Sequence, residues 1–224
     1  MLLSVSSCQK KLASEGLTSI TYYPVITLEG GSVVMSVGAT YSEPGYSALL
    51  NGEDVTKDVK VSDNIDNTTF GNYTVTYSIV NSDGFSSSTS RDVMVVNENS
   101  FANFYYSEVR NATGTRHYYD APITIEELGN GNYEISDLIG GLYFYGIYPG
   151  YEPTYDFHAE CEIALDSDNN ITLIEEGDWY WYDPTNPLTI QVGTYYPDEG
   201  RVHLEVGFSG ETSFYIDLVT PSAN

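Results

Sequence analysis

The apolar residues of this chain recur at every second position in short runs, and no segment keeps an apolar period of 3.6 residues. The clearest run covers residues 72–80, where tyrosine, valine and isoleucine alternate with threonine and serine. This alternation is typical of a half-buried antiparallel strand. Clusters of glycine, asparagine, aspartate and serine separate the runs and favour tight turns. The sequence therefore predicts an all-β protein.

The charge of the chain excludes two kinds of partner. Its 224 residues include 32 acidic and 8 basic side chains, which gives a net charge of −24. So few basic residues cannot neutralise a run of phosphates, and an anionic membrane surface repels such a chain. We therefore predict no nucleic-acid partner. With 41% hydrophobic residues, 21 tyrosines and 20 glycines, the composition is that of a folded, strand-rich chain rather than a disordered acidic tail.

The N-terminus predicts a lipid anchor. A short apolar stretch ends at Cys8, and a glutamine and two lysines follow. This resembles a bacterial lipobox, in which Cys8 becomes the lipid-bearing first residue of the mature protein. The resemblance implies that residues 1–18 are a signal remnant and tether, and that contact with the membrane is only through the lipid. The alternative is an N-terminus with an ordinary cysteine.

The second cysteine, Cys161, has no partner within the chain if Cys8 is acylated. It lies in the run 155–165, where the odd-numbered positions are apolar and the even-numbered ones are largely polar. That run predicts a half-buried strand with Cys161 facing the core. No motif places a histidine and a third group beside the thiol, so we predict no nucleophilic role for it.

The predicted strands fall into two blocks. Residues 19–98 contain six or seven short runs and fit an Ig-like β-sandwich. Residues 99–224 hold 21 of the 32 acidic residues, 3 of the 8 basic residues and 15 of the 21 tyrosines. Ten runs there predict strands without a helix, among them 142–148, 179–182 and 201–208. Such a series suggests an antiparallel β-barrel or a second β-sandwich.

Motifs in both blocks resemble bacterial surface modules. The segments that carry the resemblance are 44–46, 51–56, 71–77 and 81–93 for an Ig-like module, and 136–143 and 163–173 for a β-rich C-terminal domain of unknown function. Together they resemble two-domain surface lipoproteins of the Bacteroidota phylum. Such lipoproteins accompany SusC/SusD-type importers, in which a lidded TonB-dependent barrel takes up glycans or oligopeptides. The resemblance implies an outer-membrane, cell-surface location and importer components as partners.

Two aromatic clusters are the candidate ligand or partner contacts. Their members are Trp179, Tyr180, Trp181 and Tyr182, and Tyr143, Tyr145, Tyr148 and Tyr151. In a strand, the two tryptophans of the first cluster share one face and its two tyrosines share the other. One pair then fills the core, and the other forms a platform on which a sugar ring or a peptide side chain stacks. An interface with the other domain or with a partner is the alternative.

The oxygen-rich loops predict turns rather than metal sites. Residues 166–170 follow the start of a calcium loop, but Ile171 and Gly177 occupy the places of its glycine and its bidentate glutamate. The run 63–67 predicts a solvated turn, with a weak calcium site as the alternative. The three histidines are dispersed, and no nucleophile, Walker or dinucleotide motif occurs. We predict no catalytic residue, no metal and no cofactor.

These observations leave three hypotheses for function. The first is a non-enzymatic, lipid-anchored accessory protein of a SusC/SusD-type importer of oligopeptides or glycans. The second is a stand-alone glycan-binding surface lipoprotein. The third is a small hydrolase, which the many acidic residues permit but do not indicate. The sequence does not distinguish peptide from glycan cargo.

Overall fold

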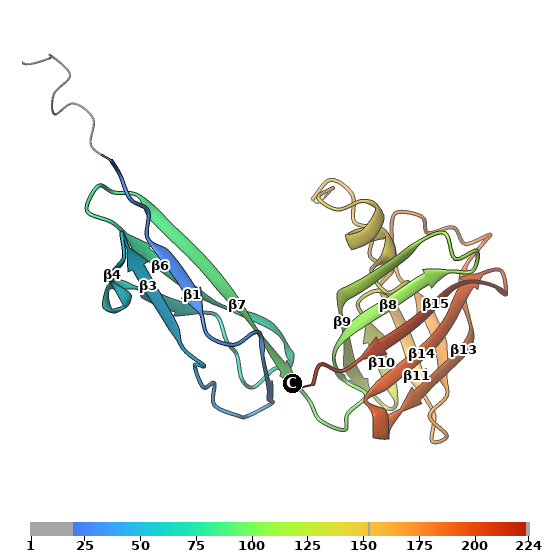
Figure 1. The fold of residues 1–224 in the computed structure, drawn as a ribbon. Coiled ribbons are helices and arrows are strands. Elements are labelled where there is room, and N and C mark those ends of the chain that lie inside the picture. The colour runs from blue at the N-terminus through green and yellow to red at the C-terminus, as the bar shows by residue number, and fades with distance from the viewer. Residues whose placement is uncertain (1–19, 152, 223–224) are drawn as a thin grey trace, which may run out of the picture.

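The computed structural model describes residues 20–151 and 153–222, and strands dominate both parts of the chain (Figure 1). The predicted all-β class is confirmed. Cys8, the predicted lipidation site, lies outside the described residues. No helix within the described ranges is long and apolar enough to cross a membrane.

The first part of the chain forms two small sheets. One sheet has the order β1 (Val25–Leu28), β3 (Tyr46–Leu50), β4 (Glu53–Asp54), and the other has the order β2 (Val33–Ser36), β7 (Ser86–Val96), β6 (Gly71–Val80), β5 (Lys60–Asp63). A short 3-10 helix, η1 (Thr56–Asp58), lies between β4 and β5. Side chains from both sheets enclose a core built around Met35, Val75, Tyr77, Val93 and Val95. The alternation in residues 72–80 therefore places one face of β6 inside, as expected.

The second part forms one eight-stranded antiparallel sheet. Its strands are β8 (Asn103–Asn111), β9 (His117–Gly129), β10 (Asn132–Ile135), β11 (Cys161–Leu165), β12 (Ile171–Glu176), β13 (Leu188–Tyr196), β14 (Arg201–Phe208) and β15 (Glu211–Val219). Their order is β12-β11-β10-β9-β8-β15-β14-β13. A bridge between Asn170 and Thr194 joins the two edges, so the sheet nearly closes into a barrel. The fully buried Tyr105, Ile123 and Leu204 belong to its interior.

The oxygen-rich loops are turns, as predicted. The carboxylate of Asp166 accepts hydrogen bonds from the backbone N–H groups of Asp168 and Asn170, both at 2.8 Å, and closes the β11–β12 hairpin. In the run 63–67, Asp63 and Asp66 likewise accept backbone N–H groups two residues ahead. Side-chain oxygens that cap their own backbone in this way stabilise tight turns.

Two predicted strands are wrong, and both belong to the aromatic clusters. Instead of a strand over 142–148, a π-helical turn, η2 (Leu142–Ile147), follows Gly140 and Gly141, whose φ angles are 66° and 77°. Two successive left-handed residues turn the chain away from the extended path that pairing requires. At Gly141, a Cβ atom would lie 2.5 Å from the Cβ of Ala121, so the close packing itself requires glycine.

Residues 179–182 form a turn instead of the predicted strand, in which the N–H of Tyr182 donates to the carbonyl of Trp179 at 2.9 Å. The carboxylate of Glu176 closes this loop, because it accepts both the indole Nε1–H of Trp179 (2.7 Å) and the N–H of Leu188 (2.8 Å). The aromatic alternation resembles a strand pattern, but these two hydrogen bonds join the ends of a loop between β12 and β13.

One other boundary differs from the sequence prediction. The strand predicted over 155–165 begins only at Cys161. The alternation of 155–165 still holds in burial, because Phe157, Ala159 and Cys161 are all buried. Cys161 is a free thiol in the core, and burial raises its pKa to about 12. A thiol that stays protonated at neutral pH is a poor nucleophile.

Candidate functional site

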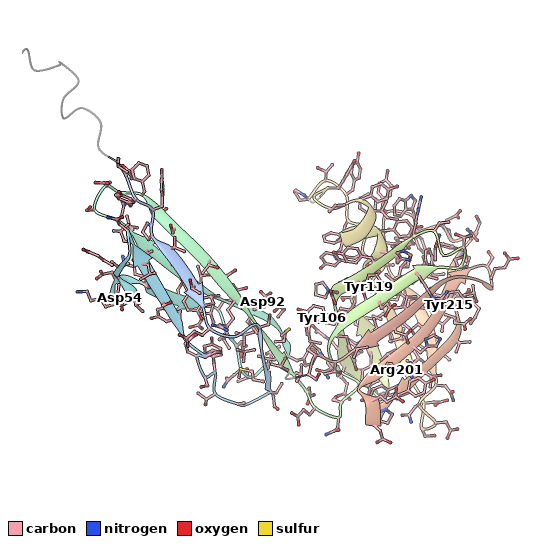
Figure 2. The ribbon with its side chains drawn as sticks, in the orientation of Figure 1. Asp54, Asp92, Tyr106, Tyr119, Arg201 and Tyr215 are labelled. Carbon is pink, nitrogen blue, oxygen red and sulfur yellow. The ribbon has the colours of Figure 1, made fainter. Side chains whose placement is uncertain are left out.

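The two predicted aromatic clusters meet at one end of the barrel. The turn η2 and the loop after it, yellow in Figure 1, lie there, and large side chains crowd around them (Figure 2). The ring of Trp181 lies 4.7 Å from that of Tyr143 and 5.5 Å from that of Tyr148, measured between centroids. Residues nearly forty positions apart in the sequence thus form one aromatic cluster.

The inner layer of this cluster belongs to the barrel core. The side chains of Trp179 and Phe157 are only 6% and 4% exposed. Trp181 is half-buried, and its ring lies 4.8 Å from that of Phe157 and 5.7 Å from that of Trp179. The two tryptophans therefore pack on the core side of the cluster, whereas the neighbouring Tyr180 and Tyr182 reach the surface.

The outer layer is a row of three tyrosines, Tyr151, Tyr155 and Tyr180, which we call the aromatic ridge. Their exposed fractions are 52%, 43% and 52%. The Tyr155 ring lies 6.5 Å from that of Tyr151 and 5.1 Å from that of Tyr180. All three rings contact the buried Phe157, at 6.0, 6.3 and 5.0 Å. One core phenylalanine thus holds three exposed rings in place, which lowers the entropy cost of using them for binding.

The remaining predicted contacts lie beside the ridge. Tyr145, which belongs to η2, packs against Phe144 and His158, and its ring lies nearly parallel to that of Tyr118 on β9. These contacts attach η2 to the barrel. Tyr182 is 45% exposed and lines a neighbouring hollow. Neither Tyr155 nor Phe157 was predicted as a contact residue from the sequence. The sequence feature that could have identified them is the run of apolar residues at odd-numbered positions in 155–165, which was interpreted as core packing alone.

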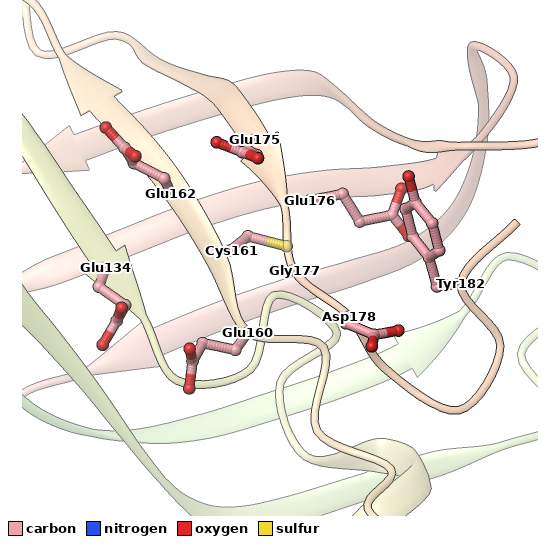
Figure 3. A pocket seen from close by; sticks show the side chains of 9 residues that line it. All are labelled: Glu134, Glu160, Cys161, Glu162, Glu175, Glu176, Gly177, Asp178 and Tyr182. Carbon is pink, nitrogen blue, oxygen red and sulfur yellow. The ribbon is translucent and has the colours of Figure 1, made fainter. Parts of the chain in front are cut away.

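The hollow beside the ridge is acidic (Figure 3). It has a volume of about 370 Å³ and is lined by Glu134, Glu160, Cys161, Glu162, Glu175, Glu176, Gly177, Asp178 and Tyr182. We call this the acidic hollow. Glu160 and Asp178 also line an adjoining hollow of about 220 Å³, together with Ser136, Asp156 and His158. Neither lining includes a lysine or an arginine.

The strand register explains much of this acidity. Glu134 on β10 lies directly opposite Glu126 on β9 and Glu162 on β11, and Glu162 lies opposite Glu175 on β12. Four glutamates therefore form a row across four adjacent strands, which we call the glutamate row. Burial, together with the charges of Glu160, Glu126 and Glu162, raises the pKa of Glu134. Like charges directly opposite one another in a sheet are destabilising, so the fold maintains this row at a cost.

A buried carboxylate holds the start of the aromatic segment. Asp137 is 1% exposed, and it accepts the N–H of Ile139 at 2.8 Å and that of Gly141 at 3.1 Å. These bonds shape the tight turn that leads into η2. Burial raises the pKa of Asp137 from 3.8 to about 6, although the backbone hydrogen bonds and nearby His158 act in the opposite direction.

This raised pKa predicts a specific pH dependence of stability. The folded state holds the Asp137 proton more tightly than the unfolded chain, so the stabilisation from protonation is complete below about pH 4 and lost as pH rises through about 6. Relative to Asp137→Asn, the wild-type free energy of unfolding should fall by about 2 kcal/mol between pH 4 and pH 7. Urea titrations of both proteins across this range measure the difference. Parallel pH profiles would show that Asp137 titrates normally.

Comparisons with known proteins are consistent with the sequence resemblance. A family model for a bacterial surface protein Ig-like domain matches residues 26–95. The model for the C-terminal domain of BT2262-like proteins matches residues 95–220, more than half of the chain. The crystal structure of the lipoprotein BT2262 from Bacteroides thetaiotaomicron is 27% identical, covers 88% of this chain and 100% of its own, and gives a TM-score of 0.55.

Two structures of ZmpB from Clostridium perfringens are more distant. One contains CBM51-2 in complex with GlcNAc and INT domains, and the other contains the M60 catalytic domain with CBM51-1 and CBM51-2. They are 16% and 17% identical, cover 88% and 89% of this chain and 43% and 21% of their own, and give TM-scores of 0.28 and 0.29, too low to support an argument. No curated protein matches the chain. Because its family model covers more than half of the sequence, the chain belongs to the BT2262-like family and combines that family's C-terminal domain with a bacterial surface Ig-like domain.

Proposed function

We propose that this chain is a non-enzymatic, lipid-anchored protein of the outer-membrane surface that docks onto a SusC/SusD-type importer of oligopeptides or glycans. The aromatic ridge is the observation that carries a binding role. Exposed tyrosines held by a core residue provide a large, preorganised contact area, and such residues dominate binding energy at interfaces. The Ig-like domain serves as a spacer between the lipid and the barrel.

The anchoring part of the proposal draws on two observations. The solved relative BT2262 is named a lipoprotein, and Cys8 of this chain follows a lipobox-like stretch. The importer part draws on the family resemblance of the two modules. The non-enzymatic part draws on two carboxylates of the acidic hollow that form structural hydrogen bonds. Glu176 accepts the indole N–H of Trp179 and the backbone N–H of Leu188, and Glu162 accepts the side-chain N–H of Asn132.

A pull-down from solubilised outer membranes tests the docking. The wild-type lipoprotein should recover a barrel and a lid protein. The Tyr155→Ala/Tyr180→Ala variant should recover about tenfold less of both, because the exposed rings supply the contact. Tyr22→Ala is the matched control, since Tyr22 is 45% exposed but belongs to the Ig-like part, and it should change nothing. Wild-type lipoprotein recovered without a barrel or a lid protein would refute the docking.

A stand-alone glycan-binding protein is the second candidate function, and the ridge also favours it, because tyrosine rings stack on sugar faces. This candidate predicts that purified protein binds a polysaccharide and that Tyr155→Ala/Tyr180→Ala loses the binding. Calorimetry across a broad glycan panel measures it, and the absence of heat with every glycan would remove this candidate. Tyr180 is a sharper probe than either tryptophan, because the tryptophans support the barrel core.

A further inference from the structure

The glutamate row has no cationic counterpart within the described residues. The arginine ion pairs formed there join Arg91 to Glu43, and Arg201 to Glu199 and Asp217. None of them involves a glutamate of the row. The negative charges of β9, β10, β11 and β12 therefore repel one another across the sheet without neutralisation by the chain itself.

The fold leaves most carboxylates of the acidic hollow unused. Within the described ranges, the side chains of Glu134, Glu160, Glu175 and Asp178 form no hydrogen bond or ion pair. A carboxylate that caps a turn or pairs with arginine has a structural purpose, as Asp166 does in the β11–β12 hairpin. These four side chains have none, so their charge is available to a partner.

The acidic hollow and the aromatic ridge are built from the same two segments of the chain. The turn after β12 carries Asp178 and Tyr182 into the hollow and Tyr180 into the ridge (Figure 3 shows Asp178 and Tyr182). On the other side, Glu160 of the hollow follows the buried Phe157, which supports the ridge, by three residues. The same two segments therefore supply exposed aromatic rings and unpaired carboxylates, and we call the ridge and the hollow together the combined surface.

We propose that this combined surface docks an extended basic peptide segment, with arginine or lysine side chains directed at the glutamate row and the acidic hollow. Arginine is the side chain that meets both halves of the surface, because its planar guanidinium stacks on tyrosine rings and pairs with carboxylates. The row spans four strands about 4.8 Å apart, hence about 14 Å, which matches about four residues of an extended peptide. This inference shares with the proposed function only the assumption that the chain is a binding protein. It adds that the partner segment is basic and extended.

Fluorescence anisotropy with the purified full chain tests this docking surface. The probe is a labelled decapeptide that alternates arginine and glycine. We expect it to bind, and to bind more weakly as salt rises, because the contact depends on charge complementarity. The Glu134→Gln/Glu175→Gln variant should bind about tenfold more weakly, and so should Tyr155→Ala/Tyr180→Ala.

A matched control separates the docking surface from general attraction by an acidic protein. Glu53→Gln/Asp58→Asn removes the same two charges from exposed positions in the Ig-like part and should leave the affinity unchanged. An equal loss in both acid-to-amide variants would overturn the proposal. Binding of a glutamate–glycine decapeptide as tight as that of the arginine peptide would also overturn it. The same holds if spermidine binds as tightly as the arginine peptide and if Glu134→Gln/Glu175→Gln and Tyr155→Ala/Tyr180→Ala weaken spermidine binding equally.

Thermal unfolding provides a second readout. Since Glu134→Gln/Glu175→Gln relieves like-charge repulsion, its Tm should equal or exceed that of the wild type while its affinity falls. A lower Tm in this variant would overturn the claim that the row is maintained against stability. No importer is present in these assays. If the wild-type protein recovers importer components but does not bind the arginine peptide, only this inference is refuted. If it binds the peptide but recovers no importer components, only the importer docking is refuted.

Discussion

Replacing Arg91 with leucine is expected to lower the free energy of unfolding of the Ig-like domain by about 3 kcal/mol, because a buried guanidinium loses its hydrogen bonds and a partly buried ion pair is broken. Arg91 is 3% exposed. Its guanidinium donates to the carbonyls of Gly31 (2.5 Å), Glu29 (2.8 Å) and Gly45 (3.0 Å), and to the carboxylate of Glu43 (3.3 Å). Without Arg91, these acceptors lose their donor in a partly buried site.

The same arginine joins the two sheets of the sandwich. Arg91 belongs to β7 in one sheet, whereas Glu29 and Gly45 flank β1 and β3 in the other. The hydroxyl of Tyr77, a core residue of β6, bonds to both Arg91 and Glu43. The substitution therefore removes a polar connection between the sheets as well as a charge.

Unfolding in urea followed by two signals measures this effect. Both tryptophans lie in the barrel, so tryptophan fluorescence reports on that domain, whereas far-UV circular dichroism reports on all strands. Arg91→Leu should shift the dichroism transition to lower urea and leave the fluorescence transition in place. Arg201→Leu is the control, because Arg201 lies on the outer barrel surface with a 29% exposed side chain (Figure 2), where an ion pair contributes about 0–1 kcal/mol. Equal transitions for Arg91→Leu and wild type would contradict the prediction.

Replacing Trp179 with alanine is expected to destabilise the barrel by about 3–5 kcal/mol, the range for truncating a large buried aromatic side chain. Trp179 is 6% exposed and packs in the barrel core, where its ring lies 6.4 Å from that of Tyr143. The truncation also removes the indole N–H that Glu176 accepts, and so weakens the closure of the loop between β12 and β13.

Thermal unfolding followed by circular dichroism measures the change, since the substitution alters tryptophan fluorescence directly. Tyr180→Ala, one residue away and 52% exposed, is the matched control and should change stability by no more than about 0.5 kcal/mol. A Trp179→Ala protein as stable as Tyr180→Ala would show that Trp179 does not support the core. Because its effect on stability is large, Trp179→Ala cannot serve as a test of ligand contact.

The sequence predicted the long strands well and the aromatic segments poorly. Residues 201–208 match β14, and residues 72–80 match β6 to within one position, because a period of two is a local property of the chain. The same reasoning failed at 142–148 and 179–182. There the aromatic residues also alternate with other residues, but two glycines in one segment and the Glu176 hydrogen bonds in the other fix turns.

The predicted contact residues were a mixture of surface and core. Tyr180 and Tyr151 reach the surface, but Trp179 is buried, and Tyr155, a member of the ridge, was not singled out. Alternation separates two faces without showing which one water reaches, because that depends on what packs against them. Here Phe157 and the barrel core cover the tryptophan side of the turn.

The sequence by itself determined the all-β class, the hairpin turns and the burial of Cys161, since each follows from neighbouring residues and their backbone preferences. The tertiary structure alone decided that two distant aromatic segments form one ridge and that Glu126, Glu134, Glu162 and Glu175 stand in a row. The row depends on strand register, which is shifted by irregularities at Asn132/Tyr133 and Glu162/Ile163. A shift of one residue would send these side chains to the opposite face of the sheet, so the acidic surface arises from long-range pairing.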